Sequence, residues 1–588
     1  MPSSESKPRL AFRVGVTGKR ELSPAQEAEL RPRLAETLSV IKATLENEST
    51  RAQGAYSEES PILWAISPLA EGADRLFAEE ALKLGYELQV PLPFLRDEYK
   101  KDFHAPDSCP EFDRLVAKAT AVFEVEGETD FAGVHLPAAY ETVGHLVVDH
   151  CDLLIAIWDG EPAKGNGGTA HVMEMARHRG IPVVCFGIGA AADTPLDTDA
   201  IIHAVRPPWL AFEELARTTE PGSAGQSRVP GSLEGRAGPV RASKKPGAPD
   251  ANGSYLETAS SKKPMLRTLW SWFFKLMSFG AKLPKVWPES IPPSDLKPRY
   301  ERMDAIATRL SGLYRGAFLL NYTLGLCAVF FALLGYADEE RAKYWLWSEL
   351  AAILIVAALI VSIHRRRWHF RSVDCRYLTE QFRILCYIDQ LGLTAPPLRL
   401  SAHQLNSDVQ KSWMEWRLRG LLRERPLPQV KLTIAEARRY YEDVVDDLIQ
   451  SQIVYHARNK ESMEKVEKRL DRLAWFFVGV AAAACLLHFH FPPSSQVARW
   501  LTLCAAGFPA AASACHAIGS QGEFRRLSAR SEAMHSGLKA IRDKMEQLSR
   551  SGRLSPATLR QECVALAALM IEEVVDWQIL YRKPVPPG

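Results

Sequence analysis

Four apolar windows set the strongest limit on how this 588-residue chain can fold. They cover residues 316–336, 345–364, 473–491 and 500–518. Each window is about as long as a helix needs to be to cross the hydrocarbon core of a bilayer. Although 24% of all residues are charged, very few charges fall inside these windows. We therefore predict a membrane protein with four transmembrane helices.

Charges beside the windows predict how the helices are oriented. Basic residues stand at the outer ends of each pair of windows, among them Arg309, Arg315, Arg365, Lys468, Arg472 and Arg525. The loop inside the first pair is acidic, and the loop inside the second pair carries little charge. Because loops rich in Lys and Arg stay on the cytoplasmic side, we predict a multi-pass protein of the inner membrane with both termini in the cytoplasm.

The two pairs of windows look like copies of one hairpin. Each pair is entered and left by a charged helical stretch, which suggests duplicated modules at 295–456 and 457–588 with cytoplasmic helical stalks. No Pro or Gly occurs between Trp345 and Leu391, so we expect one unbroken helix of about 70 Å there. Asn321 and Thr323 are expected to form hydrogen bonds between helices, and a kink is expected at Pro509.

Residues 1–215 have a different pattern, in which short apolar runs alternate with helical stretches. The expected strands are 10–16, 61–66, 88–92, 121–124, 153–158 and 182–186. Ser23, Pro24 and Gln26 give a capping box that opens the first helix. Alternation of strands and helices predicts an α/β fold, a Rossmann-like domain with a parallel, doubly wound sheet.

Three loops in this region are rich in small residues and follow predicted strands. They are 15–20 (GVTGKR), 67–75 (SPLAEGADR) and 159–170, which includes KGNGGTA. Glycine allows a ligand to approach the backbone, and the free N–H groups at a helix start attract phosphate. Ligands of such sheets bind beyond the carboxyl ends of the strands, so the three loops together predict a nucleotide site. The alternative is three tight connections that bind nothing.

These motifs, with LPF at 92–94 and CDLLIAIWDGEPAKGNGGTA at 151–170, resemble the SLOG superfamily. SLOG domains are Rossmann-like and related to the LOG nucleotide hydrolases and to the ligand-sensing N-terminal domain of TRPM channels. The resemblance implies a nucleotide-derived ligand of unknown identity, and no covalently bound cofactor. It places the contacts on Gly15, Thr17, Gly18, Arg20, Ser67, Gly72, Asp74, Gly167, Gly168 and Thr169.

Enzymatic activity of the LOG type is less favoured. LOG hydrolases carry PGGxGTxEE, whereas here the stretch reads GNGGTAHVME, so His171 and Val172 stand where the glutamates would fall. Glu174 is acidic but displaced, and we interpret His171 as a helix-surface residue. Arg20 and Asp74 remain possible catalytic groups, or else form a structural ion pair. We therefore assign no catalytic residue and expect a sensor rather than a nucleotide N-glycosidic hydrolase.

Between the α/β region and the first window the composition changes twice. Residues 216–264 are rich in Gly, Pro and Ser without periodicity, which predicts a flexible linker. Residues 265–287 interleave aromatic residues and lysines, which predicts an amphipathic helix in the membrane interface or, as the alternative, a helix packed against another domain. The ten cysteines form no CxxC pair, so we predict no metal site.

The helical half resembles SLATT domains, two-transmembrane modules often associated with SLOG proteins in bacterial conflict systems. The family is proposed to form pores, so the resemblance implies a membrane effector that senses a nucleotide signal and permeabilises or depolarises the membrane, in antiphage defence. The alternative is a membrane-tethered nucleotide hydrolase. The expected partners are the lipid bilayer, a nucleotide-like ligand and further copies of the chain in a homo-oligomer, with no direct binding of nucleic acid. Ligand identity, oligomer number and ion selectivity stay open.

Overall fold

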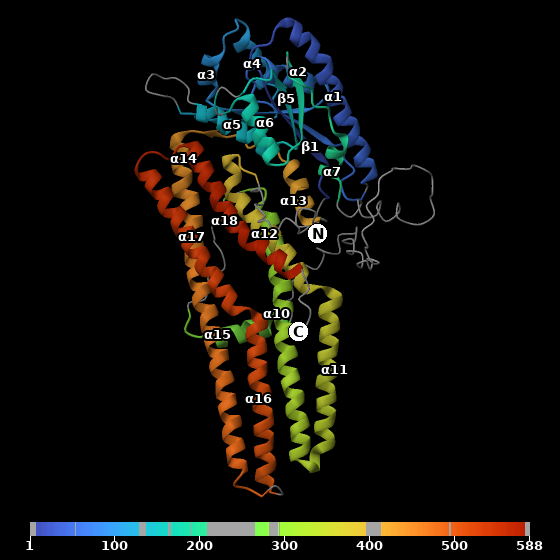
Figure 1. The fold of residues 1–588 in the computed structure, drawn as a ribbon, viewed down its shortest axis with the longest axis vertical. Helices are drawn as coiled ribbons and strands as arrows, with labels where there is room; N and C mark the ends of the chain where they lie inside the picture. Colours follow the sequence, from blue (N-terminus) through green and yellow to red (C-terminus); the bar gives the residue numbers. More distant parts are fainter. Residues whose placement is uncertain are drawn as a thin grey trace, which may run out of the picture. The chain divides into compact units, whose positions relative to one another are not determined.

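The computed structural model describes residues 7–52, 54–128, 137–162, 165, 167–189, 191–207, 265–281, 292, 294–394, 413–492 and 495–582. The expected linker at 216–264 lies outside these residues. The chain divides into two compact units, an α/β unit and a helical unit, drawn together in Figure 1. The α/β unit contains residues 1–258, 388–439 and 553–564, and the helical unit contains the remaining three segments.

A seven-stranded sheet forms the centre of the α/β unit, and all its strand pairs are parallel. The strands lie in the order β6-β5-β1-β2-β3-β4-β7. Their bounds are β1 Ala11–Gly18, β2 Ile62–Ile66, β3 Glu87–Leu92, β4 Ala121–Val125, β5 Leu153–Trp158, β6 Val183–Gly187 and β7 Lys431–Leu432. The predicted parallel α/β sheet is confirmed, and each of the six expected strands is found to within two residues.

Helices connect the strands of this sheet. They are α1 Pro24–Arg51, α2 Ala73–Lys83, α3 Arg96–Tyr99, α4 Ser108–Val116, α5 Pro137–His150, α6 Thr169–His178 and α7 Thr198–Val205. The capping box predicted for α1 is present: Ser23 accepts a hydrogen bond from the Gln26 N–H, and the Gln26 side chain accepts one from the Ser23 N–H. This reciprocal pair fixes where the chain leaves the first loop and starts the helix.

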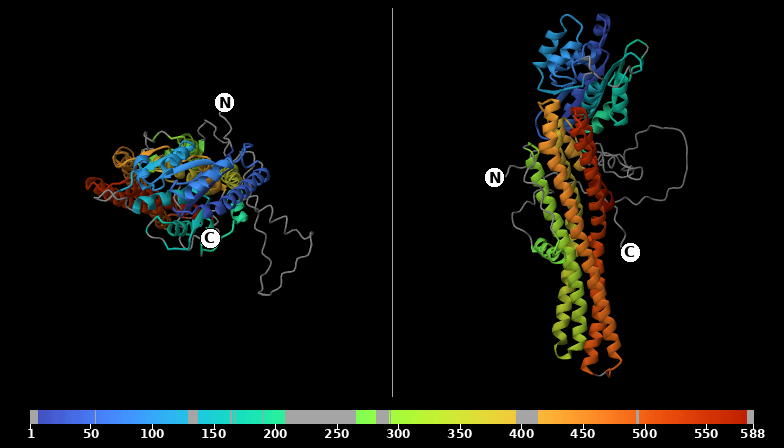
Figure 2. Two further views of the ribbon diagram at one scale, coloured as in Figure 1. Left: turned by 90° about the horizontal axis from the view of Figure 1, so that it is seen from above. Right: turned by 90° about the vertical axis from the view of Figure 1, so that its left-hand side faces the viewer.

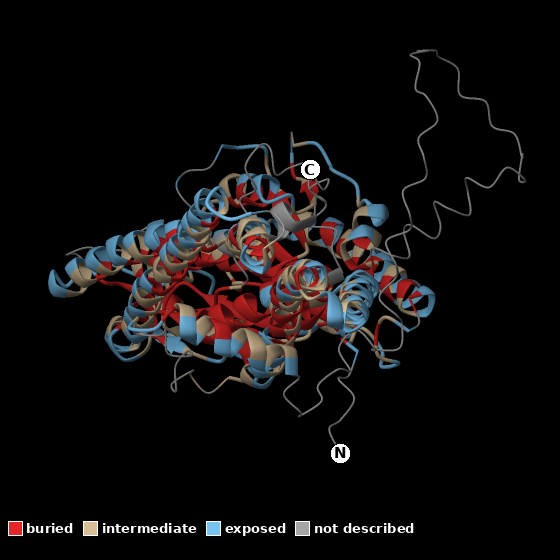
Figure 3. Cartoon of the chain, turned by 90° about the horizontal axis from the view of Figure 1, so that it is seen from below, coloured by how far each residue is buried: buried red, intermediate tan, exposed pale blue. Residues whose placement is uncertain are grey.

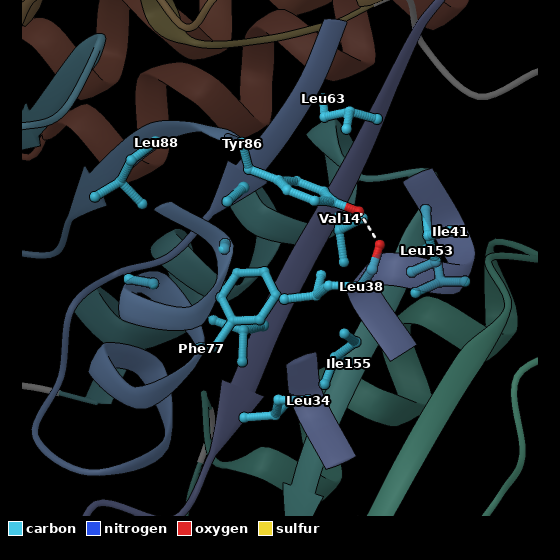
Figure 4. Packing of buried hydrophobic residues seen from close by; sticks show 14 of the residues in the cluster. Val14, Leu34, Leu38, Ile41, Leu63, Phe77, Tyr86, Leu88, Leu153 and Ile155 are labelled. Carbon is cyan, nitrogen blue, oxygen red and sulfur yellow. Dashed lines mark hydrogen bonds between the residues drawn. The ribbon is translucent and has the colours of Figure 1, made fainter. Parts of the chain in front are cut away.

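The core of the α/β unit is apolar and continuous. The strands are buried, whereas the helices have outer faces that are exposed (Figure 3). Leu34 and Leu38 of α1 and Phe77 of α2 pack against Val14 of β1 (Figure 4). The buried Tyr86 hydroxyl donates a 2.8 Å hydrogen bond to the Leu38 carbonyl oxygen, so its burial is compensated (Figure 4).

Two segments from the second half of the chain complete the α/β unit. Helix α13 (Trp413–Arg423) and strand β7 belong to it, and β7 pairs with β4. The Trp64 indole donates to the Arg423 carbonyl oxygen at 2.7 Å, and the buried Arg423 guanidinium lies 2.7 Å from Asp152. The unit therefore extends beyond residues 1–215, into a range where the sequence analysis expects a stalk.

The helical unit consists mainly of long helices. They are α9 Met265–Met277, α10 Lys297–Ala337, α11 Ala342–Arg366, α12 Trp368–Ile388, α15 Asp446–His488, α16 Gln496–Gly522 and α17 Phe524–Arg550. The α14 helix (Ile434–Tyr440) precedes α15 through a π-helical turn, and α18 (Pro556–Arg582) begins in the α/β unit and continues into this one. Among the described residues, four helical runs are long and apolar enough to cross a membrane. Three of them contain a predicted window whole, and the run Ile434–His488 covers the window 473–491 as far as residue 488.

The expectation of one helix from Trp345 to Leu391 is wrong. The helix breaks at Arg367, whose φ of 49° is left-handed, and its N–H caps α11 by donating to the Ile363 carbonyl oxygen at 3.0 Å. The second hairpin breaks in the same way at Glu523, with φ 50°, between α16 and α17. At Arg367 the left-handed residue ends the helix with no Pro or Gly beside it, so this break has no simple sequence signal, whereas Gly522 precedes Glu523 at the second break. Helix α16 itself continues through Pro509.

Candidate functional site

The three loops rich in small residues follow strands that are neighbours in the sheet. They leave β5, β1 and β2, which lie side by side in that order. The chain runs from β1 outward through β2, β3 and β4, then returns to the other side of β1 with β5 and β6. The order therefore reverses between β1 and β5, and in open parallel sheets ligands bind at the carboxyl end of such a reversal.

The loop after β1 contributes backbone more than side chains. Gly15 lies inside the strand, and a Cβ there would come 2.8 Å from Val147 Cγ1, so its role is packing against α5. Thr17 and Gly18 form the end of the strand and are partly exposed. A Cβ on Gly18 would lie 2.4 Å from the Cβ of Ala73, so glycine is needed for the first two loops to meet.

The loop after β2 is held in a strained but well-bonded conformation. Leu69 has a φ of 57°, and the Ser67 hydroxyl accepts the Leu69 N–H at 3.2 Å while donating to the Asp74 carbonyl oxygen at 2.9 Å. Gly72 has a φ of 77°, and a Cβ there would meet the Arg20 carbonyl oxygen at 2.2 Å. Ser67 and Gly72 therefore shape the loop.

The loop after β5 ends at the start of α6. Gly168 is the N-cap residue and Thr169 the first helical residue, and both are partly exposed. Gly167 has a φ of 88° and packs against the backbone of Tyr140. Its N–H donates to Nδ1 of His171 at 3.0 Å, so His171 holds the loop instead of facing solvent alone. Three residues of this loop, 163, 164 and 166, lie outside the described residues.

Two cations stand on this edge of the sheet. Lys19 lies 2.9 Å from Asp159, and this hydrogen bond raises the pKa of Lys19. The Arg20 guanidinium lies over the Tyr140 ring, 5.0 Å from its centroid, and 3.9 Å from Asp102. The carboxylate that pairs with Arg20 is thus Asp102, not Asp74. Both cations are about 40–45% exposed, so an anionic group in solvent can reach them.

Asp74 is a buried carboxyl beside these loops. Burial raises its pKa to about 7, while the Ala70 N–H and the charges of Arg20 and Arg75 act in the opposite direction. The side chain accepts the Ala70 N–H at 3.3 Å, which orders the loop after β2. A carboxyl whose pKa is near 7 can give up or accept a proton at neutral pH. Among the residues predicted for the site, Asp74 is the one group with such a pKa.

Sequence reasoning missed three polar residues that the structure places next to Arg20. The Tyr140 hydroxyl donates to Asp102, and Tyr99 is buried close by, where desolvation raises its pKa strongly. Tyr140 comes from α5 and Asp102 from the short helix η1 (Lys100–Asp102), far apart in sequence. Neither has a glycine motif around it.

Within the membrane-length helices, one expectation is corrected. The Thr323 hydroxyl donates to carbonyl oxygens of its own helix, Leu319 and Leu320, both at 3.0 Å, instead of bonding to another helix. This local bond is common for Thr in apolar helices because it satisfies the hydroxyl without a partner. Asn321 has a buried Oδ1 for which the described part of the chain supplies no hydrogen-bond donor.

The chain matches no protein-family model, no curated protein and no solved structure. The class of protein that the structure itself defines is a parallel α/β unit combined with four helices of membrane-spanning length.

Proposed function

We propose that this chain is a membrane effector that binds a nucleotide-derived ligand on its α/β unit and permeabilises or depolarises the membrane through its helical unit. The observation that carries the proposal is the meeting of the three small-residue loops on neighbouring strands β5, β1 and β2. Four helices of membrane-spanning length in the same chain supply the effector half. The resemblance to SLOG and SLATT modules adds the role in antiphage defence, and the basic residues at the outer ends of the windows support cytoplasmic termini.

A phosphate fits this edge for electrostatic reasons. The N–H groups of Thr169, Ala170 and His171, in the first turn of α6, have no carbonyl partner inside the helix and point out of its start, whereas the Gly168 N–H donates to the Gly165 carbonyl oxygen at 3.3 Å. Lys19 and Arg20 supply positive charge nearby on the neighbouring strand. A bound phosphate competes with Asp159 for Lys19, so binding exchanges an internal ion pair for one with the ligand. Because four spans form a narrow bundle, a pore requires several protomers.

The test is thermal unfolding of the full chain in detergent against ADP-ribose, NAD, mononucleotides, and cyclic and linear oligonucleotides. The full chain is needed because α13 and β7 are part of the α/β unit. We expect one compound to stabilise the protein and Thr169→Arg to remove the effect. Thr198→Arg is the matched control, because Thr198 is also the first residue of a helix, α7, and is exposed. Equal loss in both variants, or no shift with any compound, would contradict the proposed site.

A nucleotide hydrolase remains the second candidate because of Asp74. Its pKa of about 7 allows it to act as an acid near neutral pH, as N-glycosidic cleavage requires. Incubating the full chain with each stabilising nucleotide and analysing the products by chromatography distinguishes the two functions. A hydrolase releases free base and loses activity in Asp74→Asn. A sensor returns its ligand intact.

A further inference from the structure

Helix α9 has two apolar faces, and only one of them is covered. The inner face, with Trp270, Phe273 and Phe274, packs in a cluster with residues of α10, α15 and α17. On the outer face Trp272 is 63% exposed and Leu276 is 51% exposed, and Phe279, just after the helix, is 78% exposed. The alternative expected for this segment, a helix packed against other elements, is thus found on one side, while its place in the membrane interface stays a prediction. Residues 282–287 of the predicted segment lie outside the described residues.

The inner face ties the two hairpins together. On α10 of the first hairpin, Gly312 leaves room for the Arg267 side chain, and Gly316 leaves room for the α9 backbone: a Cβ on Gly316 would lie 2.0 Å from the Leu266 carbonyl oxygen. On the second hairpin, Arg469 of α15 donates to the Leu276, Met277 and Phe279 carbonyl oxygens at 2.7–3.1 Å. These are the unsatisfied carbonyls at the C-terminal end of α9, where a cation is favoured.

Trp270 extends this link to the break between α16 and α17. Its ring lies parallel to that of Phe524 with the centroids 6.2 Å apart, and 5.6 Å from the Phe318 centroid of α10. The Arg315 guanidinium lies 5.5 Å from the Trp270 centroid. One aromatic side chain of α9 therefore contacts both hairpins, next to the left-handed residue Glu523.

The position of α9 relative to the membrane-length helices indicates what its exposed outer face contacts. In Figures 1 and 2 α9, coloured green, lies across the long helices and not along them. The exposed apolar surface of α15 begins at Trp475 and Phe476, which are 75% and 61% exposed. Arg469 precedes Trp475 by six residues, or about 9 Å along the helix. The C-terminal end of α9, which Arg469 contacts, therefore lies about 9 Å from the exposed apolar surface of α15, called the apolar band below. This distance is similar to the depth of the headgroup region of a bilayer.

The charge around α9 is positive. Residues 265–281 contain Arg267 and Lys275 and no acidic residue. Lys468 adjoins Arg469 and pairs with Glu464, and its side chain is 69% exposed; Arg472 lies between Arg469 and the apolar band. Residues 465–475 of α15 contain four basic residues and two acidic ones, Glu467 and Asp471, so the local charge is net positive.

We propose that the outer face of α9 binds anionic phospholipid in the headgroup region of the bilayer, while its inner face clamps the two hairpins together. Trp272, Leu276 and Phe279 contact acyl chains near the glycerol level, and Lys275 contacts the headgroup phosphate. The lipid composition of the membrane then acts directly on the packing between the hairpins. The inference concerns lipid binding alone and does not depend on the ligand site of the α/β unit.

The first test measures which lipids the full chain retains. Protein in detergent is mixed with equal amounts of phosphatidylglycerol and phosphatidylcholine, and the co-purifying lipid is quantified by mass spectrometry. We expect the wild type to prefer phosphatidylglycerol, and Lys275→Glu to lower that preference by roughly fivefold or more, as expected for one charge near a membrane surface. Lys539→Glu is the matched control, because Lys539 is exposed on α17, about 22 Å beyond the break.

The second test measures depth. The chain is reconstituted in liposomes containing brominated phosphatidylglycerol, and the fluorescence of wild type and Trp272→Phe is compared. The proposal predicts that the fluorescence contributed by Trp272, obtained by difference, is quenched. An unchanged lipid preference in Lys275→Glu, an equal loss in Lys539→Glu, or an unquenched Trp272 would each overturn it.

Discussion

The two hairpins of the helical unit share a design and differ in where they are buried. In each, a long helix leads to a short connection, a second helix and then a break at a non-glycine residue with φ near 50°, Arg367 or Glu523. An aromatic residue that is buried follows each break, Trp368 in the first hairpin and Phe524 in the second. The two hairpins thus share one backbone conformation at their breaks, and the duplication of one module stays a prediction.

Before the breaks the second hairpin is the more buried of the two, and after the breaks the first hairpin is. In the most apolar 18-residue window of the run that contains α11, 6% of the residues are buried. In the corresponding window of the run that contains α16, 28% of the residues are buried. Beyond the break the relation reverses: α12 buries Tyr377, Leu378 and Thr379 in succession, so all its sides are covered, while α17 buries a single face. The comparison teaches that two hairpins of the same design are buried to different extents because their helices have different neighbours, as α16 does where it packs against α10.

The largest expected effect concerns how α9 is attached to the first hairpin. Gly316→Ala places a Cβ against the backbone of α9, which cannot move aside cheaply, so we expect a loss of roughly 2–3 kcal/mol. Gly325→Ala on the same helix is the control, because nothing lies within 4 Å of a Cβ there. Unfolding in detergent measures both. Equal effects would mean that α9 is not held by the glycine contact.

The contact between the hairpins themselves comes next. A Cβ on Gly507 of α16 would lie 2.8 Å from Cε1 of Phe330 of α10, and the ring is able to shift slightly. We therefore expect Gly507→Ala to destabilise the protein by roughly 1–2 kcal/mol. Gly479→Ala on α15, where a Cβ meets nothing within 4 Å, should be neutral or slightly stabilising. A neutral Gly507→Ala would show that α16 is not packed on the first hairpin.

We expect acidic pH to destabilise the folded chain at the first break, Arg367, and not at the second, Glu523. His369, two residues after Arg367, stacks on Tyr314 with the centroids 4.4 Å apart, and burial, then the charge of Arg315, lowers its pKa to about 4. The unfolded chain binds a proton at His369 near pH 6.5, whereas the folded chain does not, so stability falls as the pH drops from about 6.5 to 4. The equivalent residue in the second hairpin is an arginine, Arg525, and not a histidine.

The measurement is the melting temperature of wild type and His369→Gln at pH 7.5 and pH 5. Acidification should destabilise the wild type more than the variant, with a difference on the order of 1–2 kcal/mol. An identical fall in melting temperature in both proteins would show that His369 does not cause the loss of stability in acid. Other buried histidines, such as His456, would then be its cause.

The smallest effect is expected at the breaks. Glycine adopts a left-handed conformation without the steric penalty of other residues, so Arg367→Gly and Glu523→Gly should each stabilise the protein, by roughly 0.5–1 kcal/mol. Arg366→Gly, inside α11, should destabilise it by about 1 kcal/mol. A gain at only one break would show that the two copies are not equivalent there.

Local patterns predicted the elements of the α/β unit well. The strands needed only apolar runs, and α1 needed only Ser23, Pro24 and Gln26 at its start. Strand β7 could not be predicted, because its two residues, Lys431 and Leu432, are too few to show a strand pattern. They form a strand only by pairing with β4, which is far away in sequence. The break at Arg367 was missed because a left-handed arginine is set by tertiary packing and not by composition.

The candidate site was predictable in its backbone and not in its side chains. Glycines such as Gly72 and Gly167 leave a sequence signal because their positive φ or close contacts restrict the residue type. Asp102 and Tyr140, which surround Arg20, leave none, because they meet only in the folded sheet. The predicted alternative for Arg20, an ion pair with Asp74, is replaced by the pair with Asp102.

The most direct test of the central claim is ligand-dependent leakage from liposomes that contain the full chain. The compound that raises the melting temperature is added to dye-loaded proteoliposomes of wild type, Thr169→Arg and Thr198→Arg. The account predicts dye release on adding the compound for wild type and Thr198→Arg, and none for Thr169→Arg. Release that is independent of the compound, or equal in all three proteins, would contradict coupling between the loops after β5, β1 and β2 and the membrane helices.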